Sequence, residues 1–225
     1  MSNFSLDEST ISKVNRVTAK MAEKFAQVAR LTQDEKLAIH HFARISMIGA
    51  SSRIENAILT DSEIEWMDLM LDEDGKTTAF SKHKKVILNK LSKDKERTID
   101  EVAGCRAMYE LIYSQARDWD PLAESTIRGL HAELTKFDNE AKQPIGEYKK
   151  TVNSVAEVNQ LTKEKKIVFR TAEPGLQTNL AMKNLVDWFN QHYKNSPWPI
   201  AVSCEFVFRF LAIHPFADGN GRVGR

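Results

Sequence analysis

The chain has 225 residues, of which 42% are hydrophobic and 28% are charged, and its formal net charge is +1. This length and composition predict a folded protein with a sizeable core and exclude wholesale disorder. A net charge so close to zero gives no bulk electrostatic basis for binding nucleic acid or a membrane surface, so neither is an expected partner.

Apolar residues recur at helical spacing along the first half of the chain. We expect helices over residues 4–31, 33–48, 62–71, 98–117 and 121–137. Asp61 and Ser62 are expected to open the third of these helices, and Thr98 or Asp100 is expected to cap the fourth.

One segment in the second half departs from the helical pattern. Residues 146–174 contain two groups of valine and other apolar residues on either side of a polar turn at 162–166, which predicts a β-hairpin. Helices are expected again over 178–193 and 200–213. The last of these is apolar almost all round, which is typical of a helix at the centre of a domain. The expected fold class is mainly α, with one small β-hairpin.

The last twelve residues, 214–225, combine a histidine, a carboxylate, glycines and two arginines. Gly219 and Gly221 permit backbone conformations in which successive N–H groups point to one place, which suits an anion. Arg222 and Arg225 are three positions apart and would share one face of a helix. Taken singly, a histidine after a buried helix and Asp-Gly or Asn-Gly turns are more often structural. Their combination with two arginines favours a phosphate site.

This segment resembles the Fic motif, His-Pro-Phe-x-Asp/Glu-Gly-Asn-Gly-Arg-x-x-Arg, and matches it at every specified position. The resemblance extends back to about residue 40. It implies a Fic-type helical domain in which the hairpin is the flap. It also implies three regions, an N-terminal helical segment at 1–40, an inhibitory helix at 41–60 and the Fic core at 61–225. In the family the helix of the second arginine continues past the motif, so we expect a fragment truncated after the catalytic motif.

Proteins of this family typically transfer AMP from ATP to a hydroxyl group of a target protein and release pyrophosphate. The resemblance implies that His214 takes the proton of the attacking hydroxyl, because imidazole titrates near neutral pH. Asp218 would hold Mg²⁺, which prefers carboxylate and phosphate oxygens. The implied cofactors are therefore ATP and Mg²⁺. The implied nucleotide-binding residues, through backbone N–H or guanidinium groups, are Gly219, Asn220, Gly221, Arg222 and Arg225.

Residues 51–56 allow two interpretations. They match the family's inhibitory pattern, Ser/Thr-x-x-x-Glu-Gly/Asn, counted from Ser51. The structural alternative is a capping box with Ser52 as the N-cap and Glu55 at N3. Beside the terminal motif we favour the inhibitory interpretation, in which Glu55 forms a bidentate pair with Arg225 and blocks the position of the γ-phosphate. The chain thus resembles family members that inhibit themselves from the N-terminal side.

The expected function is a self-inhibited, Mg²⁺-dependent protein adenylyltransferase. Two alternatives stay open. One is a related enzyme that removes AMP or moves another phosphate-containing group, and the other is a non-catalytic regulator that only binds a nucleotide. The expected partner is a target protein docked by strand addition on the flap, at about 153–170, although a purely structural hairpin is equally consistent with the sequence. Homo-oligomerisation stays open.

Targeting signals and cysteines bear on location. The sequence has no run of about 18 apolar residues and no leader with a charged start and an apolar centre. Cys105 and Cys204 both lie in apolar, helix-like settings, which predicts two buried free thiols, although one disulfide stays open. The expected location is the cytoplasm.

Overall fold

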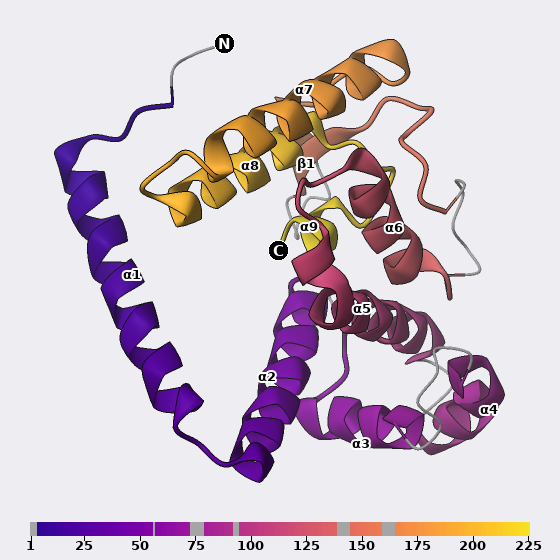
Figure 1. The fold of residues 1–225 in the computed structure, drawn as a ribbon. Helices are drawn as coiled ribbons and strands as arrows, with labels where there is room; N and C mark the ends of the chain where they lie inside the picture. Colours follow the sequence, from indigo (N-terminus) through magenta and orange to yellow (C-terminus); the bar gives the residue numbers. More distant parts are fainter. Residues whose placement is uncertain (1–3, 56, 73–78, 92–94, 139–144, 159–164) are drawn as a thin grey trace.

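The computed structural model describes residues 4–55, 57–72, 79–91, 95–138, 145–158 and 165–225, which form the mainly α fold expected from the sequence (Figure 1). The helices are α1 (Glu8–Ala29), α2 (Gln33–Ile54), α3 (Asp61–Asp72), α4 (Ala79–Leu91), α5 (Glu96–Gln115), the 3-10 helix η2 (Ala116–Asp118), α6 (Glu124–Thr135), α7 (Leu176–Tyr193), α8 (Pro199–Ile213) and α9 (Asn220–Gly224). The strands β1 (Ser154–Val158) and β2 (Lys165–Arg170) pair antiparallel, which confirms the small hairpin.

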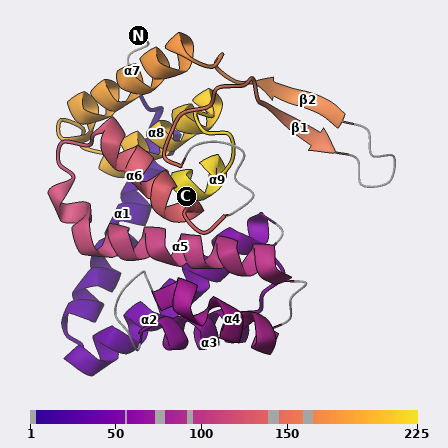
Figure 2. The ribbon, with the colours of Figure 1, turned by 90° about the vertical axis from the view of Figure 1, so that its right-hand side faces the viewer.

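Two hydrophobic clusters form the core. The first is built from α2 to α5 with Leu134 of α6, and the second from α6, α7 and α8 with Phe216 of the following loop. Val223 of α9 packs against both clusters, so the terminal motif lies where they meet. Figure 2 shows α9 beside α6, with α5 below and the hairpin extending away from the body.

Several helix ends differ from expectation. α2 continues to Ile54, so Ser52 lies inside its final turn and the capping-box interpretation of Ser52 and Glu55 is wrong. The N-cap of α2 is Thr32, whose hydroxyl and the Glu35 carboxylate form the reciprocal bonds of a capping box. α5 begins at Glu96 without a side-chain cap. Asp100, one of the two expected caps, instead accepts a 2.8 Å hydrogen bond from Lys84.

Burial also differs from expectation on α8. Only Ala201, Val202 and Phe210 of α8 are buried, and Phe208 is 68% exposed. The expectation of a helix at the centre of the domain is wrong for this side of α8, because α7, α9 and a few residues of α1 cover only part of its surface. Cys204, on the uncovered side, is exposed rather than buried, whereas Cys105 is buried and both thiols are free.

The first helix stands apart from the others over most of its length (Figure 1), and none of its residues is buried. In the described ranges, every helix falls short of the combined length and hydropathy that crossing a bilayer requires.

Candidate active site

The loop after α8 begins with a left-handed histidine. His214 has φ 53° and ψ 59°, and it is the only non-glycine residue with positive φ among the residues that the structure describes. Its N–H donates to the Phe210 carbonyl at 2.9 Å, and its left-handed conformation then ends the helix. Pro215 follows and has no amide donor, so the chain cannot continue as helix and turns into the loop.

The hydrogen-bond partner of the His214 ring shows which of its two nitrogens carries the hydrogen. Nδ1 lies 3.3 Å from the Leu211 carbonyl oxygen, and a carbonyl only accepts hydrogen bonds, so Nδ1 carries the hydrogen and Nε2 keeps its lone pair. Burial, more than the positive charge of the nearby Lys149, lowers the pKa of His214 below its usual value. The half-buried ring is therefore neutral at physiological pH and can act as a base through Nε2.

Asn220 closes the loop through its side chain. Its side chain is buried, with the residue 1% exposed, and its amide bonds both sides of Phe216: Oδ1 accepts from the Phe216 N–H at 2.9 Å, and Nδ2 donates to the Phe216 carbonyl at 2.8 Å. The N–H of Gly219 donates to Oδ1 of Asp218 at 2.6 Å. The Gly219 N–H, expected from the sequence to face an anion, is thus occupied by its neighbour's carboxylate.

His131 of α6 contacts the loop at Phe216 and Asp218, a role that was not predicted from the sequence. Its ring stacks on Phe216 with 3.9 Å between the centroids. Nδ1 accepts from the Gly146 N–H at 3.1 Å, so the hydrogen resides on Nε2, which lies 3.2 Å from the carbonyl oxygen of Asp218. Burial lowers the pKa of His131 to about 4, which keeps the ring neutral in this fixed tautomer.

The buried neutral His131 predicts a specific pH dependence of stability. Its pKa is lower in the folded protein than in the unfolded chain, so the unfolded chain binds the proton first as the pH falls. We expect the free energy of unfolding to fall by up to about 3 kcal/mol between about pH 6.5 and pH 4 through this residue. Denaturant unfolding at a series of pH values measures it. His131→Phe keeps a stacking ring without a titrating group, so equal pH dependence in both proteins would contradict the assignment.

Asp218 and Arg222 face one another across the first turn of α9. The Asp218 side chain is 64% exposed, and its Oδ2 lies 3.3 Å from Nη2 of Arg222. The Arg222 side chain is only 6% exposed, and its Nε is a buried donor without a partner in the described part of the chain. Such a donor is costly unless it meets an acceptor. An exposed carboxylate beside a guanidinium whose Nε lacks an acceptor fits a Mg²⁺-bound phosphate, since Mg²⁺ takes one or two carboxylates with phosphate oxygens.

The last turn of α2 reaches Arg225. Nη2 of Arg225 donates to Oε1 of Glu55 at 2.8 Å and to the Ser51 carbonyl at 3.2 Å, and Nε lies 3.4 Å from the Ser51 hydroxyl. One hydrogen bond joins Glu55 and Arg225, where the sequence interpretation expected two. A Cβ at Gly221 would lie 2.8 Å from Glu55 Oε1, so the glycine leaves room for this carboxylate. The structure therefore places Ser51, Glu55 and Arg225 together, with a carboxylate against the motif's second glycine.

The comparison with known families decides the identity of this region. Residues 121–225 match the model of the Fic/DOC family. These residues form a Fic domain. The division of the chain at residues 40 and 60 stays a prediction.

Solved structures extend the likeness over most of the chain. A Fic domain-containing signaling protein from Bacteroides thetaiotaomicron VPI-5482 is 25% identical, with a TM-score of 0.67, over 92% of this chain and 68% of that one. A Fic family protein from Desulfovibrio desulfuricans G20 is 23% identical, with a TM-score of 0.65, over 100% of this chain and 57% of that one, and shows the fold alone.

Two curated relatives match over shorter segments. Protein adenylyltransferase Fic of Drosophila willistoni is 39% identical over 44 residues, which are 20% of this chain and 9% of that protein. A Fido domain-containing protein of Dictyostelium discoideum is 38% identical over 58 residues, which are 26% of this chain and 39% of that protein. The matched segments therefore span well under half of either curated relative.

The hairpin of the Fic domain has solvent-exposed apolar side chains. β2 pairs with β1 in a register that joins Ser154 to Arg170 and has one irregularity after Val155. Ile167, Val168 and Phe169 of β2 are all exposed. The turn expected at 162–166 lies mostly outside the described residues. Consecutive exposed apolar residues on a strand are a feature of surfaces that contact other proteins.

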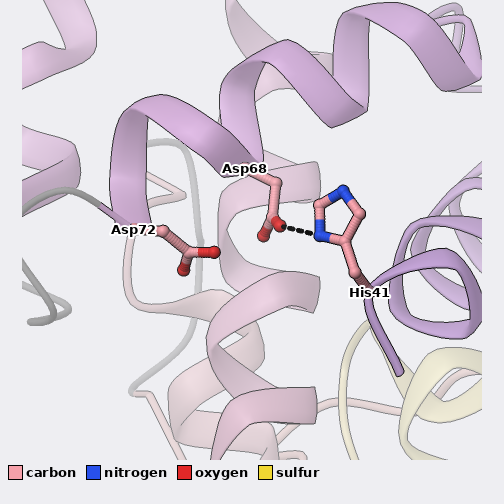
Figure 3. Close-up of side chains that lie close together, drawn as sticks. All are labelled: His41, Asp68 and Asp72. Carbon is pink, nitrogen blue, oxygen red and sulfur yellow. Dashed lines mark ion pairs between the residues drawn. The ribbon is translucent and has the colours of Figure 1, made fainter. Parts of the chain in front are cut away.

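A cluster of His41, Asp68 and Asp72 between α2 and α3 brings possible metal ligands within 4.8 Å of one another (Figure 3). Its carboxylates are already engaged. Nη2 of Arg44 lies 2.5 Å from Asp68 and 2.7 Å from Asp72, Nε of Arg106 lies 2.6 Å from Asp68, and Nη2 of Arg106 also pairs with Asp72. Two guanidinium groups neutralise the two carboxylates, so this network joins α2, α3 and α5 rather than attracting a cation.

Proposed function

We propose that this protein is a protein adenylyltransferase, which transfers AMP from ATP to a Ser, Thr or Tyr hydroxyl of a target protein, and that Glu55 restrains it. The observation that carries the proposal is the arrangement at the end of α8. A neutral His214, whose Nε2 has no partner among the described residues, lies on the same short loop as the exposed Asp218 carboxylate and Arg222, whose Nε is likewise unpaired there. The Drosophila willistoni relative, a protein adenylyltransferase by name, supports the same activity.

The chemistry assigns each group a task. The target hydroxyl attacks the α-phosphorus of ATP, forming an O–P bond, and the bond from that phosphorus to the oxygen bridging to the β-phosphate breaks. Pyrophosphate leaves with the electron pair, and Nε2 of His214 takes the hydroxyl proton. Arg222 and Arg225 would hold phosphate oxygens through planar guanidinium groups. Asp218 is the residue that would hold Mg²⁺, which neutralises phosphate charge when bound.

Glu55 would restrain this reaction by electrostatics and by occupancy. Its carboxylate bonds Arg225 at 2.8 Å and lies against Gly221, where a bound phosphate would need to sit. A phosphate and a carboxylate repel one another and compete for the same guanidinium. ATP that binds while Glu55 is in place would lack the anchor for its γ-phosphate and so would not be aligned for attack at the α-phosphate.

The hairpin is the proposed docking surface for the target. An extended segment of the target would add to the edge of the two-stranded sheet through backbone hydrogen bonds. The exposed Ile167, Val168 and Phe169 would contact its side chains. A docked segment would then lie beside the His214 loop, because Asn153 and Thr171 at the base of the hairpin belong to the same hydrogen-bond network as that loop.

Transfer of differently labelled nucleotides tests the function. We expect full-length protein carrying Glu55→Gly to become labelled by ATP with a radioactive α-phosphate and not by ATP with a radioactive γ-phosphate. Labelling from γ-labelled ATP would indicate phosphoryl transfer, and labelling from CDP-choline or UTP would indicate another transferred group. Calorimetry that shows ATP binding without any labelling would favour the non-catalytic regulator. Release of free AMP from an adenylylated target, with water taking the place of the hydroxyl on the phosphorus, would favour the alternative of an enzyme that removes AMP.

A further inference from the structure

Lys149 is a buried lysine between α6 and β1. The residue is 2% exposed and is among the largest fully buried side chains of the described chain. Nζ donates to Oδ1 of Asn153 at 2.7 Å, to the Thr171 hydroxyl at 2.8 Å and to the Ile213 carbonyl at 3.2 Å. An ammonium group has three hydrogens, so all are used, which is what burial of this charge requires. Burial lowers the pKa of Lys149 to about 8, so the ammonium form still prevails at neutral pH.

Asn153 extends this arrangement along the motif loop. Its Nδ2 donates to the Phe216 carbonyl at 2.9 Å and lies 3.4 Å from the His214 carbonyl oxygen. The backbone N–H of Lys149 donates to the Pro215 carbonyl at 2.7 Å. Each of the successive carbonyls of residues 213–216 therefore accepts a hydrogen bond from Lys149 or Asn153. We call Lys149, Asn153 and Thr171 the clamp.

The carbonyls bound by the clamp belong to His214 and to the residues directly before and after it. A left-handed conformation costs a non-glycine residue about 1–2 kcal/mol, and it persists only where surrounding contacts determine it. Pro215 has no N–H, so its carbonyl oxygen is the main-chain group by which this residue can be held. The clamp binds the carbonyls on both sides of His214 and so opposes its relaxation to an ordinary conformation.

The clamp also joins the loop to the hairpin. Asn153 directly precedes β1 and Thr171 directly follows β2. The Thr171 hydroxyl lies 2.8 Å from the Asn153 carbonyl oxygen and 2.6 Å from its Oδ1, so the two ends of the hairpin are bonded to each other. Through Lys149 this base is bonded to the end of α8. A displacement of the hairpin would therefore shift the backbone at His214.

We propose that Lys149, acting with Asn153 and Thr171, is a positioning residue that holds His214 in its left-handed conformation and couples it to the base of the hairpin. The proposal rests on the proposed function in taking His214 as the base. Lys149 also acts by its charge. Lys149 opposes protonation of the imidazole, whereas Asp218 and Glu55 favour it, as does the hydrogen bond to the Leu211 carbonyl.

Nuclear magnetic resonance of histidine-labelled full-length protein tests the clamp without ATP. His214→Ala assigns the His214 signals. The HN–Hα coupling and the Cα shift of His214 report its φ, and the Cε1–H shift reports its titration. In Lys149→Met we expect the φ-sensitive values to move toward those of an averaged conformation and the pKa of His214 to rise, because a positive charge is lost. Lys149→Arg, which keeps the charge and donors, should remain nearer to wild type.

Lys150→Met is the matched control, because Lys150 is exposed and pairs with Glu147 only at the surface. It should leave all His214 signals unchanged. Unchanged φ-sensitive values and titration in a folded Lys149→Met would overturn the proposal. Should that variant not fold, Thr171→Val tests the clamp instead, because valine keeps the shape of the side chain and removes one hydrogen-bond acceptor of Lys149 Nζ. Its φ-sensitive values should move in the same direction, and unchanged values would overturn the clamp.

Activity gives an independent readout. In a Glu55→Gly background we expect Lys149→Met to lower kcat for AMP transfer by about 10- to 100-fold, with KM for ATP little changed, because a misplaced base slows the chemical step rather than nucleotide binding. The two proposals fail differently. Unaltered His214 resonances overturn the clamp and leave the adenylyltransferase proposal intact, whereas absent labelling in the parent protein overturns the function and leaves the resonance test standing.

Discussion

Replacing Glu55 with glycine is expected to raise labelling of the full-length protein by α-labelled ATP by about 10- to 100-fold. The carboxylate bonds Arg225 at 2.8 Å and occupies the space above Gly221. A hydrogen bond to a charged group contributes about 1.5–3 kcal/mol, and each 1.4 kcal/mol is about a factor of ten in an equilibrium. Removing the carboxylate frees the guanidinium for the γ-phosphate and removes a repelling charge. Initial rates of label incorporation measure the effect.

Two further variants separate charge from shape. Glu55→Gln keeps the length of the side chain and an oxygen acceptor but removes the charge, so it should release labelling partly. Glu23→Gln makes the same chemical change on the exposed surface of α1 and should leave labelling unchanged. Equal labelling of wild type and Glu55→Gly would count against an inhibitory role for this residue and would return the Glu55–Arg225 pair to a purely structural one.

The His214→Ala substitution is expected to abolish transfer, with a fall of at least about 100-fold in a Glu55→Gly background. General-base catalysis contributes roughly 10²- to 10⁴-fold, and Nε2 of His214 is the acceptor that the loop leaves free. The protein should remain folded, because the ring makes one long contact to the Leu211 carbonyl while the main chain is held by other residues. Label incorporation and circular dichroism together check both statements.

A matched histidine keeps this result interpretable. His40→Ala removes an exposed imidazole from α2, far along the chain from the motif, and should leave labelling unchanged. The low pKa of His214 adds a second expectation: the rate should hold down to a pH below the usual titration of histidine, because the ring stays neutral there. Persistent transfer in His214→Ala would show that another group accepts the proton.

The terminal motif could be predicted from sequence because its residues are consecutive and chemically unusual together. The hairpin and most helices followed from the spacing of apolar residues. The contact of Glu55 with Arg225 was suggested only by the family's inhibitory pattern, since 170 positions separate the two residues. Local propensity also suggested a helix start at Ser52, and this was wrong because α2 continues through that position to pack Ser51 and Ser52 against the core.

The residues that support the loop were not identified from sequence because their roles arise from tertiary contacts. His131 occupies an apolar face of α6, and only the fold shows that the face lies under Phe216. Lys149 lies in a segment without periodicity, and its buried ammonium group depends on Asn153 and Thr171 at the two ends of the hairpin for hydrogen bonds. Asn220 was expected to bind the nucleotide through its backbone N–H, and the sequence did not indicate that its side-chain amide bonds Phe216 on both sides. The exposed side of α8 could not be predicted either, because hydrophobicity alone does not show which faces of a helix are covered by neighbouring elements.

Mass spectrometry of the full-length protein carrying Glu55→Gly, incubated with ATP and Mg²⁺, tests the central claim most directly. The account predicts a mass gain of one AMP, located by peptide fragmentation on a serine, threonine or tyrosine, and no gain when His214→Ala is added. An unchanged mass in the Glu55→Gly protein, or the same AMP addition with and without His214, would contradict the claim that this loop is built to transfer a nucleotide.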